Sequence, residues 1–260
     1  MHGVPRTVSR LKLCESRIDG RFMKVGSVPA NRVTAQKLIR SQSDIRAGVQ
    51  ALRRRCAVMR ELHERNGDPP LRRYRADFAG LARIIVGQQL SIASAAAIWS
   101  RLDQSLVKVD AEQIARASPD MLTAAGLSGA KIRTLKALAL ATRGAKPALR
   151  IDRLARVSDE DVRQALTQVH GIGPWTADIF IMFCLGRADA WAAGDLALQV
   201  GVARAFALGE RLLTHETLEL AERWRPWRGI AARLIWADYA YLRGRQHPRS
   251  SRPPQSRTEP

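Results

Sequence analysis

The segment His170-Gly-Ile-Gly-Pro-Trp-Thr-Ala177 holds the residues whose types and spacing most clearly suggest chemistry. Gly171 and Gly173 can adopt a positive φ and present no side chain that would block a ligand. Pro174 suits the first turn of a helix, whose free N–H groups and positive dipole favour an anion such as a backbone phosphate. We therefore expect Gly171, Gly173 and the small Thr176 to bind a phosphate. The alternative is a plain glycine-rich turn between two helices.

Helices must flank this turn, and the sequence has the corresponding pattern on both sides. Ser158 precedes three acidic residues, which predicts a helix start whose acids face the positive end of the dipole. This helix should reach Val169, and the next should extend over residues 174–185. Val169 and Ile172 should pack the turn onto the core.

The remaining sequence is also typical of an all-α protein. Apolar residues recur at helical spacing, whereas alternating strand patterns bounded by turns are nearly absent. The other helices are expected over residues 43–64, 78–86, 92–102, 118–126, 129–143, 196–208, 215–224 and 228–243.

The chain carries 43 Lys and Arg against 24 Asp and Glu, a formal net charge of +19. This excess makes DNA or RNA the first partner to consider, the alternative being a merely solubilised surface. Residues 1–55 contribute +10 and residues 243–260 contribute +4. We expect residues 1–42 and 244–260 to be disordered basic extensions of one helical domain at 43–243. They fit loose phosphate-binding arms, and equally a general arginine bias or a start site misassigned before Met23.

The cysteines set limits on cofactors and on the cellular compartment. Cys14, Cys56 and Cys184 lie far apart and form no CxxC pair, so neither a zinc site nor a four-cysteine iron–sulfur cluster is expected. The sequence has no apolar run of the roughly 18–20 residues that a membrane span needs, and it has no secretory signal. A reduced, cytoplasmic protein is therefore predicted.

The turn resembles the helix-hairpin-helix of the DNA glycosylase superfamily, in which a catalytic aspartate follows the hairpin at a nearly fixed distance. Asp195 lies 22 residues after Gly173 and should begin a helix, as in that family. The match to the 3-methyladenine DNA glycosylase II branch extends over residues 44–243. Its further segments are Ile84-Ile-Val-Gly-Gln-Gln-Leu-Ser-Ile92, Gly126-Leu-Ser-Gly-Ala-Lys131, Ala221-Glu-Arg-Trp-Arg-Pro-Trp-Arg228 and Leu234-Ile-Trp236.

The resemblance implies a two-lobed helical bundle with an active-site cleft between the lobes. Long members of the branch begin with an antiparallel sheet domain, for which residues 1–43 have no pattern, so the chain resembles a short member. Some members carry an aromatic residue four positions after the hairpin tryptophan, where this chain has Ile179. That difference leaves the details of base stacking open.

By this resemblance Asp195 is the catalytic carboxylate, which would stabilise the positive charge that develops on the sugar as the N-glycosidic bond breaks. Asp195 could instead only cap the following helix, and both roles could hold together. Asp178 and Asp238 are its rivals, Asp238 being the stronger. Bifunctional relatives use a lysine where this chain has Trp175. We therefore expect a monofunctional glycosylase, which leaves an abasic site in an intact strand.

The resemblance also suggests how a base would be bound. Trp236 and Trp175 should stack on the flipped base. No general acid is evident near the carboxylate, which suits a purine methylated at N3 or N7, because such a base is already cationic and is attracted to tryptophan faces. Gln89, with Leu90 beside it, should fill the gap in the duplex. Alternatively, Gln88 and Gln89 only cap the interrupted helix.

The remaining expectations concern ligands and partners. The carbonyls of Thr167, Val169 and Ile172 resemble a monovalent-cation site of the superfamily, and no other cofactor is expected. The expected partner is double-stranded DNA with damaged bases, bound by a monomer in the cytoplasm and associated with the nucleoid. The alternatives are a non-catalytic helix-hairpin-helix DNA-binding protein and a glycosylase for another damaged base.

Overall fold

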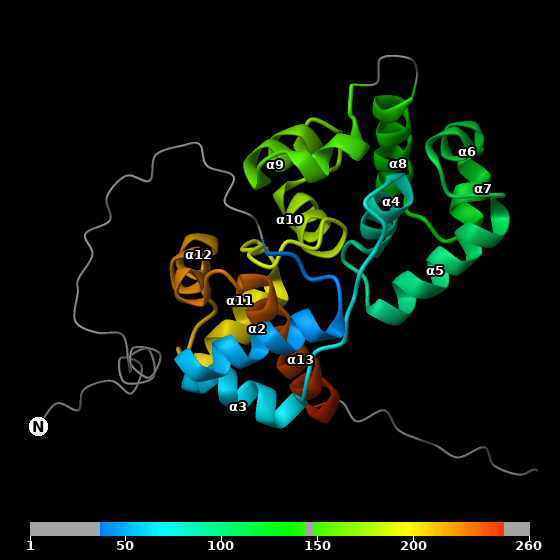
Figure 1. Ribbon diagram of the computed structural model, residues 1–260. Coiled ribbons are helices and arrows are strands. Elements are labelled where there is room, and N and C mark those ends of the chain that lie inside the picture. The colour runs from blue at the N-terminus through cyan, green and yellow to red at the C-terminus, as the bar shows by residue number, and fades with distance from the viewer. Residues whose placement is uncertain (1–36, 144–147, 247–260) are drawn as a thin grey trace, which may run out of the picture.

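A computed structural model describes residues 37–143 and 148–246 of the chain (Figure 1). Within these residues the regular structure is helical, and the only extended pairing is a single bridge between Leu38 and Arg187. The helices form two lobes, which confirms the predicted all-α, two-lobed bundle. The predictions for residues 1–36 and 247–260 lie outside the described residues.

The first lobe combines helices from the two ends of the described chain. They are α2 (Gln42–Arg55), α3 (Ala57–Asn66), α11 (Leu196–Phe206), α12 (Thr214–Ala221), the 3-10 turn η2 (Glu222–Trp224) and α13 (Arg228–Gln246). α13 packs on α11, α3 and α2, and α12 lies beside α11. This lobe is therefore closed by contacts between distant parts of the sequence.

The second lobe is formed by the middle of the chain. Its elements are α4 (Phe78–Gly87), α5 (Ile92–Ser105), α6 (Ala111–Arg116), α7 (Pro119–Ala124), α8 (Gly129–Thr142), the 3-10 helix η1 (Ile151–Arg156), α9 (Asp159–Thr167) and α10 (Pro174–Phe183). α4 packs on α5, α8 and α10, while α9 and α10 form the hairpin. The sequence analysis missed α6 and η1, because six residues are too few for helical periodicity to be visible.

Several helices begin where capping side chains predict. The Ser118 hydroxyl accepts a hydrogen bond from the Met121 N–H, and a proline occupies the first turn of α7. Ser158 and Asp161 form a reciprocal capping box at the start of α9. These local signals fixed the helix starts in the sequence, including the first helix of the hairpin.

One predicted helix is wrong in the structure. The expected helix over 43–64 divides into α2 and α3, because Cys56 takes an extended conformation with φ −141° and ψ 114°. α2 also starts earlier than expected, with Ser41 as its N-cap. At the other end of the chain, α13 continues to Gln246, three residues beyond the expected end.

The segment before α2 belongs to the folded part, so the predicted disordered extension is wrong for residues 37–42. Ile39 is fully buried, and its N–H donates to the Gly186 carbonyl at 2.7 Å. The Ala188 N–H donates to the Lys37 carbonyl at 2.8 Å. This pairing fixes the loop that follows α10.

α10 lies at the junction of the two lobes (Figure 1). Its residues from Thr176 to Phe183 are all buried, as expected for a helix that is apolar on every side. Arg233 of α13 donates a hydrogen bond to the Met182 carbonyl, which ties the lobes together. The start of α10 and the middle of α13 are joined through Asp195, which accepts hydrogen bonds from Trp175 and Trp236.

Candidate active site

Asp195 connects three helices at the junction of the lobes. Its Oδ2 accepts a hydrogen bond from the Trp175 indole N–H of α10 at 2.8 Å. Its Oδ1 accepts one from the Trp236 indole N–H of α13 at 3.0 Å and one from the Leu198 backbone N–H at 2.8 Å. The structure thus brings together the predicted catalytic residue and both predicted pocket residues.

The carboxylate of Asp195 is half-buried and is bound only by neutral donors. It forms no ion pair with any Lys, Arg or His of the described residues. Its bond to the Leu198 N–H shows that it does cap α11, so the capping interpretation is correct. The two indoles go beyond a cap, because they fix the orientation of the carboxylate and leave its negative charge uncompensated. A charge held in this way can stabilise a developing positive charge.

The two rival aspartates have a different environment. Asp238 is buried and accepts hydrogen bonds from Arg65 at 2.6 Å and from Asn66 at 3.1 Å. Asp178 is buried against Arg163 at 2.7 Å. Burial raises the pKa of Asp178 above its ordinary value, although the Arg163 guanidinium opposes this. Both carboxylates thus belong to structural ion pairs that join helices.

Trp236 and Phe183 form an aromatic wall beside Asp195. Trp236 is half-buried and stacks on Phe183 with the ring centroids 5.9 Å apart and the planes at 24°. Trp175 and Phe183 lie two turns apart on α10, with the buried Ile179 between them. The sequence analysis missed Phe183. Its signal was the i, i+4, i+8 spacing of residues 175, 179 and 183, which places the three on one helical face.

The loop after α4 exposes both residues of the predicted wedge. Gln89 is exposed and has a φ of 55°, the left-handed conformation that non-glycine residues rarely adopt. Leu90 beside it is 39% exposed. Gln88 ends α4, and its amide donates to the Thr176 hydroxyl at 2.9 Å. Capping therefore accounts for Gln88, while the side chains of Gln89 and Leu90 are free to meet a ligand.

A lysine from α8 also contacts the end of α4. The Lys131 ammonium donates to the Val86 carbonyl at 2.7 Å, one turn before the exposed wedge residues. Burial lowers the pKa of Lys131. The sequence analysis placed this lysine in a family motif without giving it a role. In the structure it holds the C-terminal end of α4 in place.

The two hairpin positions require glycine for different structural reasons. Gly171 has a φ of 80°, and a Cβ there would lie 1.9 Å from the Thr134 hydroxyl of α8. Gly173 has an extended backbone, and a Cβ there would meet nothing within 4 Å. The expectation of two positive-φ glycines is therefore correct for Gly171 only. Gly173 keeps open the space in front of α10, where no side chain caps the first N–H groups.

The other hairpin residues are placed as follows. Val169 and Ile172 are buried, which confirms that they pack the turn onto the core. Thr176 is buried as well, and its hydroxyl is engaged by Gln88, so its side chain does not face a phosphate. The Val169 carbonyl accepts the Ile172 N–H at 3.0 Å. That bond uses one lone pair, so the second remains available to a cation.

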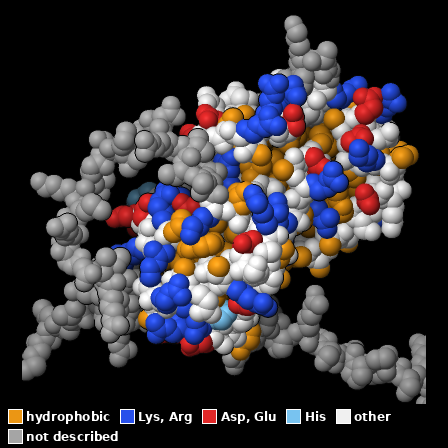
Figure 2. Space-filling view, viewed as in Figure 1, with side chains coloured by type: hydrophobic (Ala, Val, Ile, Leu, Met, Phe, Trp, Pro, Cys, Tyr) orange, Lys and Arg blue, Asp and Glu red, His pale blue; other side chains and the backbone are white. Residues whose placement is uncertain are grey.

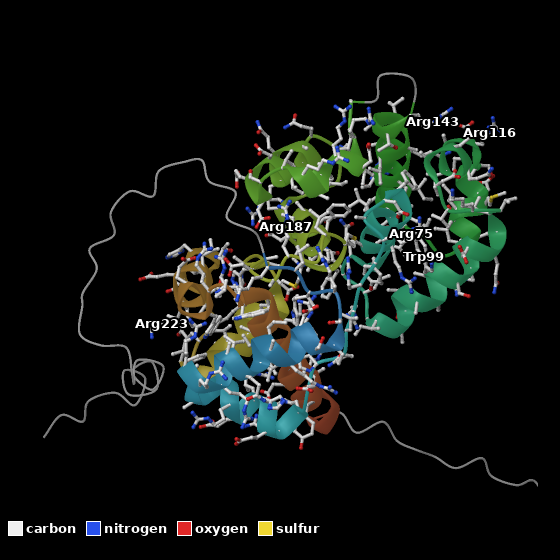
Figure 3. All side chains as sticks on the ribbon, in the orientation of Figure 1. Arg75, Trp99, Arg116, Arg143, Arg187 and Arg223 are labelled. Carbon is white, nitrogen blue, oxygen red and sulfur yellow. The ribbon has the colours of Figure 1, made fainter. Side chains whose placement is uncertain are left out.

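Basic side chains are distributed over both lobes on the face shown in Figure 2, with acidic side chains among them. Some of these arginines serve the fold. Arg187, labelled in Figure 3, is buried, pairs with Asp159 and donates to the Val157 carbonyl at 2.6 Å. Arg83 lies between the rings of Tyr74 and Trp99. The arginine count of the folded part thus overstates the charge that is free to meet DNA.

The hairpin, the aspartate at the start of the next helix and the all-α fold together define a helix-hairpin-helix base excision repair domain. In agreement, residues 82–226 match the family described as HhH-GPD superfamily base excision DNA repair protein. Since this match spans more than half of the chain, the protein belongs to that superfamily.

Two relatives with similar sequences are named as 3-methyladenine glycosylases. The chain is 32% identical over 168 residues to DNA-3-methyladenine glycosylase 1 of Schizosaccharomyces pombe, covering 61% of this chain and 73% of that protein. It is 32% identical over 92 residues to a putative DNA-3-methyladenine glycosylase of Bacillus subtilis, covering 35% of this chain and 32% of the relative's length.

Solved structures agree with the fold. A DNA-3-methyladenine glycosidase from Bacillus halodurans is similar with a TM-score of 0.63 and 29% identity, over 75% of this chain and 90% of that chain. The 3-methyladenine DNA glycosylase of Schizosaccharomyces pombe in complex with abasic DNA has a TM-score of 0.63 and 25% identity, over 73% and 95%.

Residues 37–143 and 148–246 contain neither a membrane-spanning helix nor a cluster of metal-binding side chains. No helix there is long and apolar enough to cross a membrane. No group of three or more His, Cys, Asp and Glu side chains there could hold a metal ion.

Proposed function

We propose that the protein is a monofunctional DNA glycosylase that removes alkylated purines, of the 3-methyladenine and 7-methylguanine type, from double-stranded DNA. The observation that carries this proposal is the Asp195 carboxylate, which two tryptophan indoles orient and no cation of residues 37–143 and 148–246 neutralises. The names of the relatives support the same substrate class. The expected partner is a duplex with a damaged base.

The chemistry follows from this carboxylate. As the bond between C1′ and the base nitrogen breaks, the electron pair moves to the base and positive charge develops on the sugar. Asp195 stabilises that charge, and the fixed N–H dipoles of Trp175 and Trp236 need not reorganise during the step. A water molecule then adds at C1′ and loses a proton, which leaves an abasic site. A base methylated at N3 or N7 leaves as a neutral molecule, so the site needs no general acid.

Both lobes would take part in presenting the base, the second through the hairpin and the wedge loop and the first through Trp236. The open turn at Gly173 and the uncapped N–H groups of α10 would receive a phosphate of the DNA backbone, which positions the strand without reading its sequence. Gln89 and Leu90 would enter the gap that the flipped nucleotide leaves. Trp236 offers a half-buried indole face next to the carboxylate on which the flipped base would stack.

The position of Trp175 limits the reaction to base removal. An indole cannot form a Schiff base, and no lysine nitrogen of the described residues bonds to Asp195. The strand should therefore stay intact after the base has left. The carbonyls of Thr167, Val169 and Ile172 would hold a monovalent cation beside the hairpin phosphate. When bound, that cation would supply positive charge for the phosphate.

The test is mass analysis of the free bases that the wild-type protein and D195N release from methylated DNA. The proposal expects 3-methyladenine or 7-methylguanine from the wild type, and no release by D195N despite unchanged duplex binding. Strands should break only after alkali treatment. A wild type that binds DNA and releases no base would be a non-catalytic binding protein. Release of only oxidised or mismatched bases would assign another lesion class.

A further inference from the structure

Arg233 is a buried cation that the reaction described above does not use. Its side chain is 5% exposed. The guanidinium donates to the Gly229 carbonyl at 2.7 Å and to the Met182 carbonyl at 3.3 Å, while its Nε has no hydrogen-bond partner. It forms no ion pair with a carboxylate of the described chain. A buried charge without a counter-ion is costly, so its position calls for an explanation.

The arginine remains charged at neutral pH. Burial, with repulsion from Arg72, lowers its pKa to about 10. Met182 lies in the last turn of α10, whose carbonyl end carries partial negative charge. This helix end offsets part of the cost of burial. Capping α10 is therefore the structural role of Arg233, and any further role must be tested against it.

The charge lies at one end of an aromatic wall, and Asp195 lies at the other. The Arg233 guanidinium is 4.7 Å from the centroid of Phe183, whose ring stacks on Trp236. The indole N–H of Trp236 donates to Asp195. A second cation, Arg72, lies 5.9 Å from the same Phe183 ring. A base stacked on the other face of Trp236 would thus have Asp195 at the edge of its indole neighbour and the Arg233 charge behind the two rings.

We propose that Arg233 speeds the release of cationic bases by destabilising their positive charge in the bound ground state. This inference rests on the proposed function. In an N7-methylated guanine the positive charge is on the base before cleavage. When the C1′–N9 bond breaks, its electron pair neutralises the base and the positive charge moves to the sugar, toward Asp195. Repulsion from Arg233 therefore falls as the reaction proceeds, which weakens binding and raises the rate.

The test is the concentration dependence of single-turnover excision from a duplex with one N7-methylguanine. R233M keeps the buried stem and removes the charge. We expect its half-saturating enzyme concentration to fall about three- to tenfold, for a charge acting at an effective dielectric near 20. Its maximal rate should fall by a smaller factor, because the positive charge moves to the sugar and part of its repulsion persists in the transition state. R233K should keep wild-type values. Binding of a duplex with the neutral base hypoxanthine should not tighten in R233M.

A purely structural role would give another pattern, since a distorted pocket lowers the rate and weakens binding of both bases. That result overturns the inference, as does an unchanged half-saturating concentration. A wild type that releases no base overturns the proposed function itself, which is a distinguishable failure.

R72M serves if R233M fails to fold, because Arg72 is exposed. It should shift both parameters in the same direction by a smaller factor, and identical parameters in R72M and wild type would count against the proposal. R75M is the matched control, since Arg75 is an exposed arginine of the same segment that pairs with Asp77 (Figure 3). The change in half-saturating concentration measured for R75M gives the effect of losing one exposed arginine's attraction to DNA. The change measured for R72M is compared with it.

Discussion

The carboxylates of Asp195 and Asp238 both lie at α13, one half-buried and the other buried, and they are stabilised in opposite ways. Asp195 contacts this helix through the Trp236 indole, and all its donors are neutral. Asp238 lies on the helix itself and is neutralised by Arg65, with Asn66 as a further donor. The first carboxylate keeps a negative charge that can act on a ligand, whereas the second uses its charge to join α13 to α3. The countercharge, more than burial, separates a candidate catalytic acid from a structural one.

The substitution D195N should break this comparison most strongly. It removes the charge and keeps an N-cap for α11, but its NH2 group would face an N–H donor whose hydrogen bond the carboxylate now accepts. The free energy of unfolding should therefore fall by about 1–3 kcal/mol. The rate of base release should fall by about 10³-fold, because the sugar cation loses its stabilising charge. Single-turnover kinetics and thermal unfolding measure the two effects. A rate within tenfold of wild type would remove Asp195 from the mechanism.

The substitution W236F tests the role of the indole donors. Phenylalanine keeps an aromatic ring against Phe183 but cannot donate to Asp195. We expect a loss of about 10- to 100-fold in the maximal rate, as for other fixed donors in active sites. W175F should behave similarly, and the double variant should lose less than the product of the two effects, because both donors act on one carboxylate. Strictly multiplicative losses would show that the indoles act independently.

The substitution D238N should sharpen the comparison from the structural side. It leaves Arg65 without its counter-ion and should lower the free energy of unfolding by about 1–3 kcal/mol. The rate of base release at a temperature well below the melting transition should stay at the wild-type value. Urea unfolding and single-turnover excision on the same preparation provide the comparison. A selective loss of activity in D238N would return Asp238 to the list of catalytic candidates.

The smallest expected effect is a pH dependence at Asp178. Burial raises its pKa in the folded state, so the folded protein binds this proton more tightly than the unfolded chain does. Stability contributed by this group therefore increases as the pH falls through the folded pKa toward the ordinary value of 3.8. Relative to D178N, the wild type should gain stability as the pH is lowered toward 3.8. A difference that is constant or shrinks on acidification would contradict this sign.

Local sequence signals predicted much of the fold. Ser118, Ser158 and Pro174 fixed helix starts because caps act within one turn of the chain. The break at Cys56 escaped prediction, because the apolar pattern continues through it and nothing local interrupts a helix there. Ile39 was assigned to a disordered extension, since its burial depends on residues near 186 that are far away in sequence.

The sequence predicted several residues of the candidate site but not how their side chains contact one another. The sequence analysis named Asp195, Trp175 and Trp236 from family motifs, and the structure adds that both indoles bond to the carboxylate. Phe183 and Arg233 were missed, because neither belongs to a motif and their contact joins α10 to α13. Pairings of this kind depend on how the lobes pack, which helical periodicity does not determine.

The hydrogen bond from Gln88 to Thr176 has a consequence for how such a protein would search DNA. It links the loop that carries Gln89 to the first turn of α10, so the proposed wedge would keep its position relative to the proposed phosphate-binding hairpin. Two contacts linked in this way would be held at a fixed spacing along the DNA strand. The protein would always test the nucleotide at the same distance from the phosphate that the hairpin holds. The spacing between the held phosphate and the tested nucleotide would thus be set by the fold before any damaged base has been found.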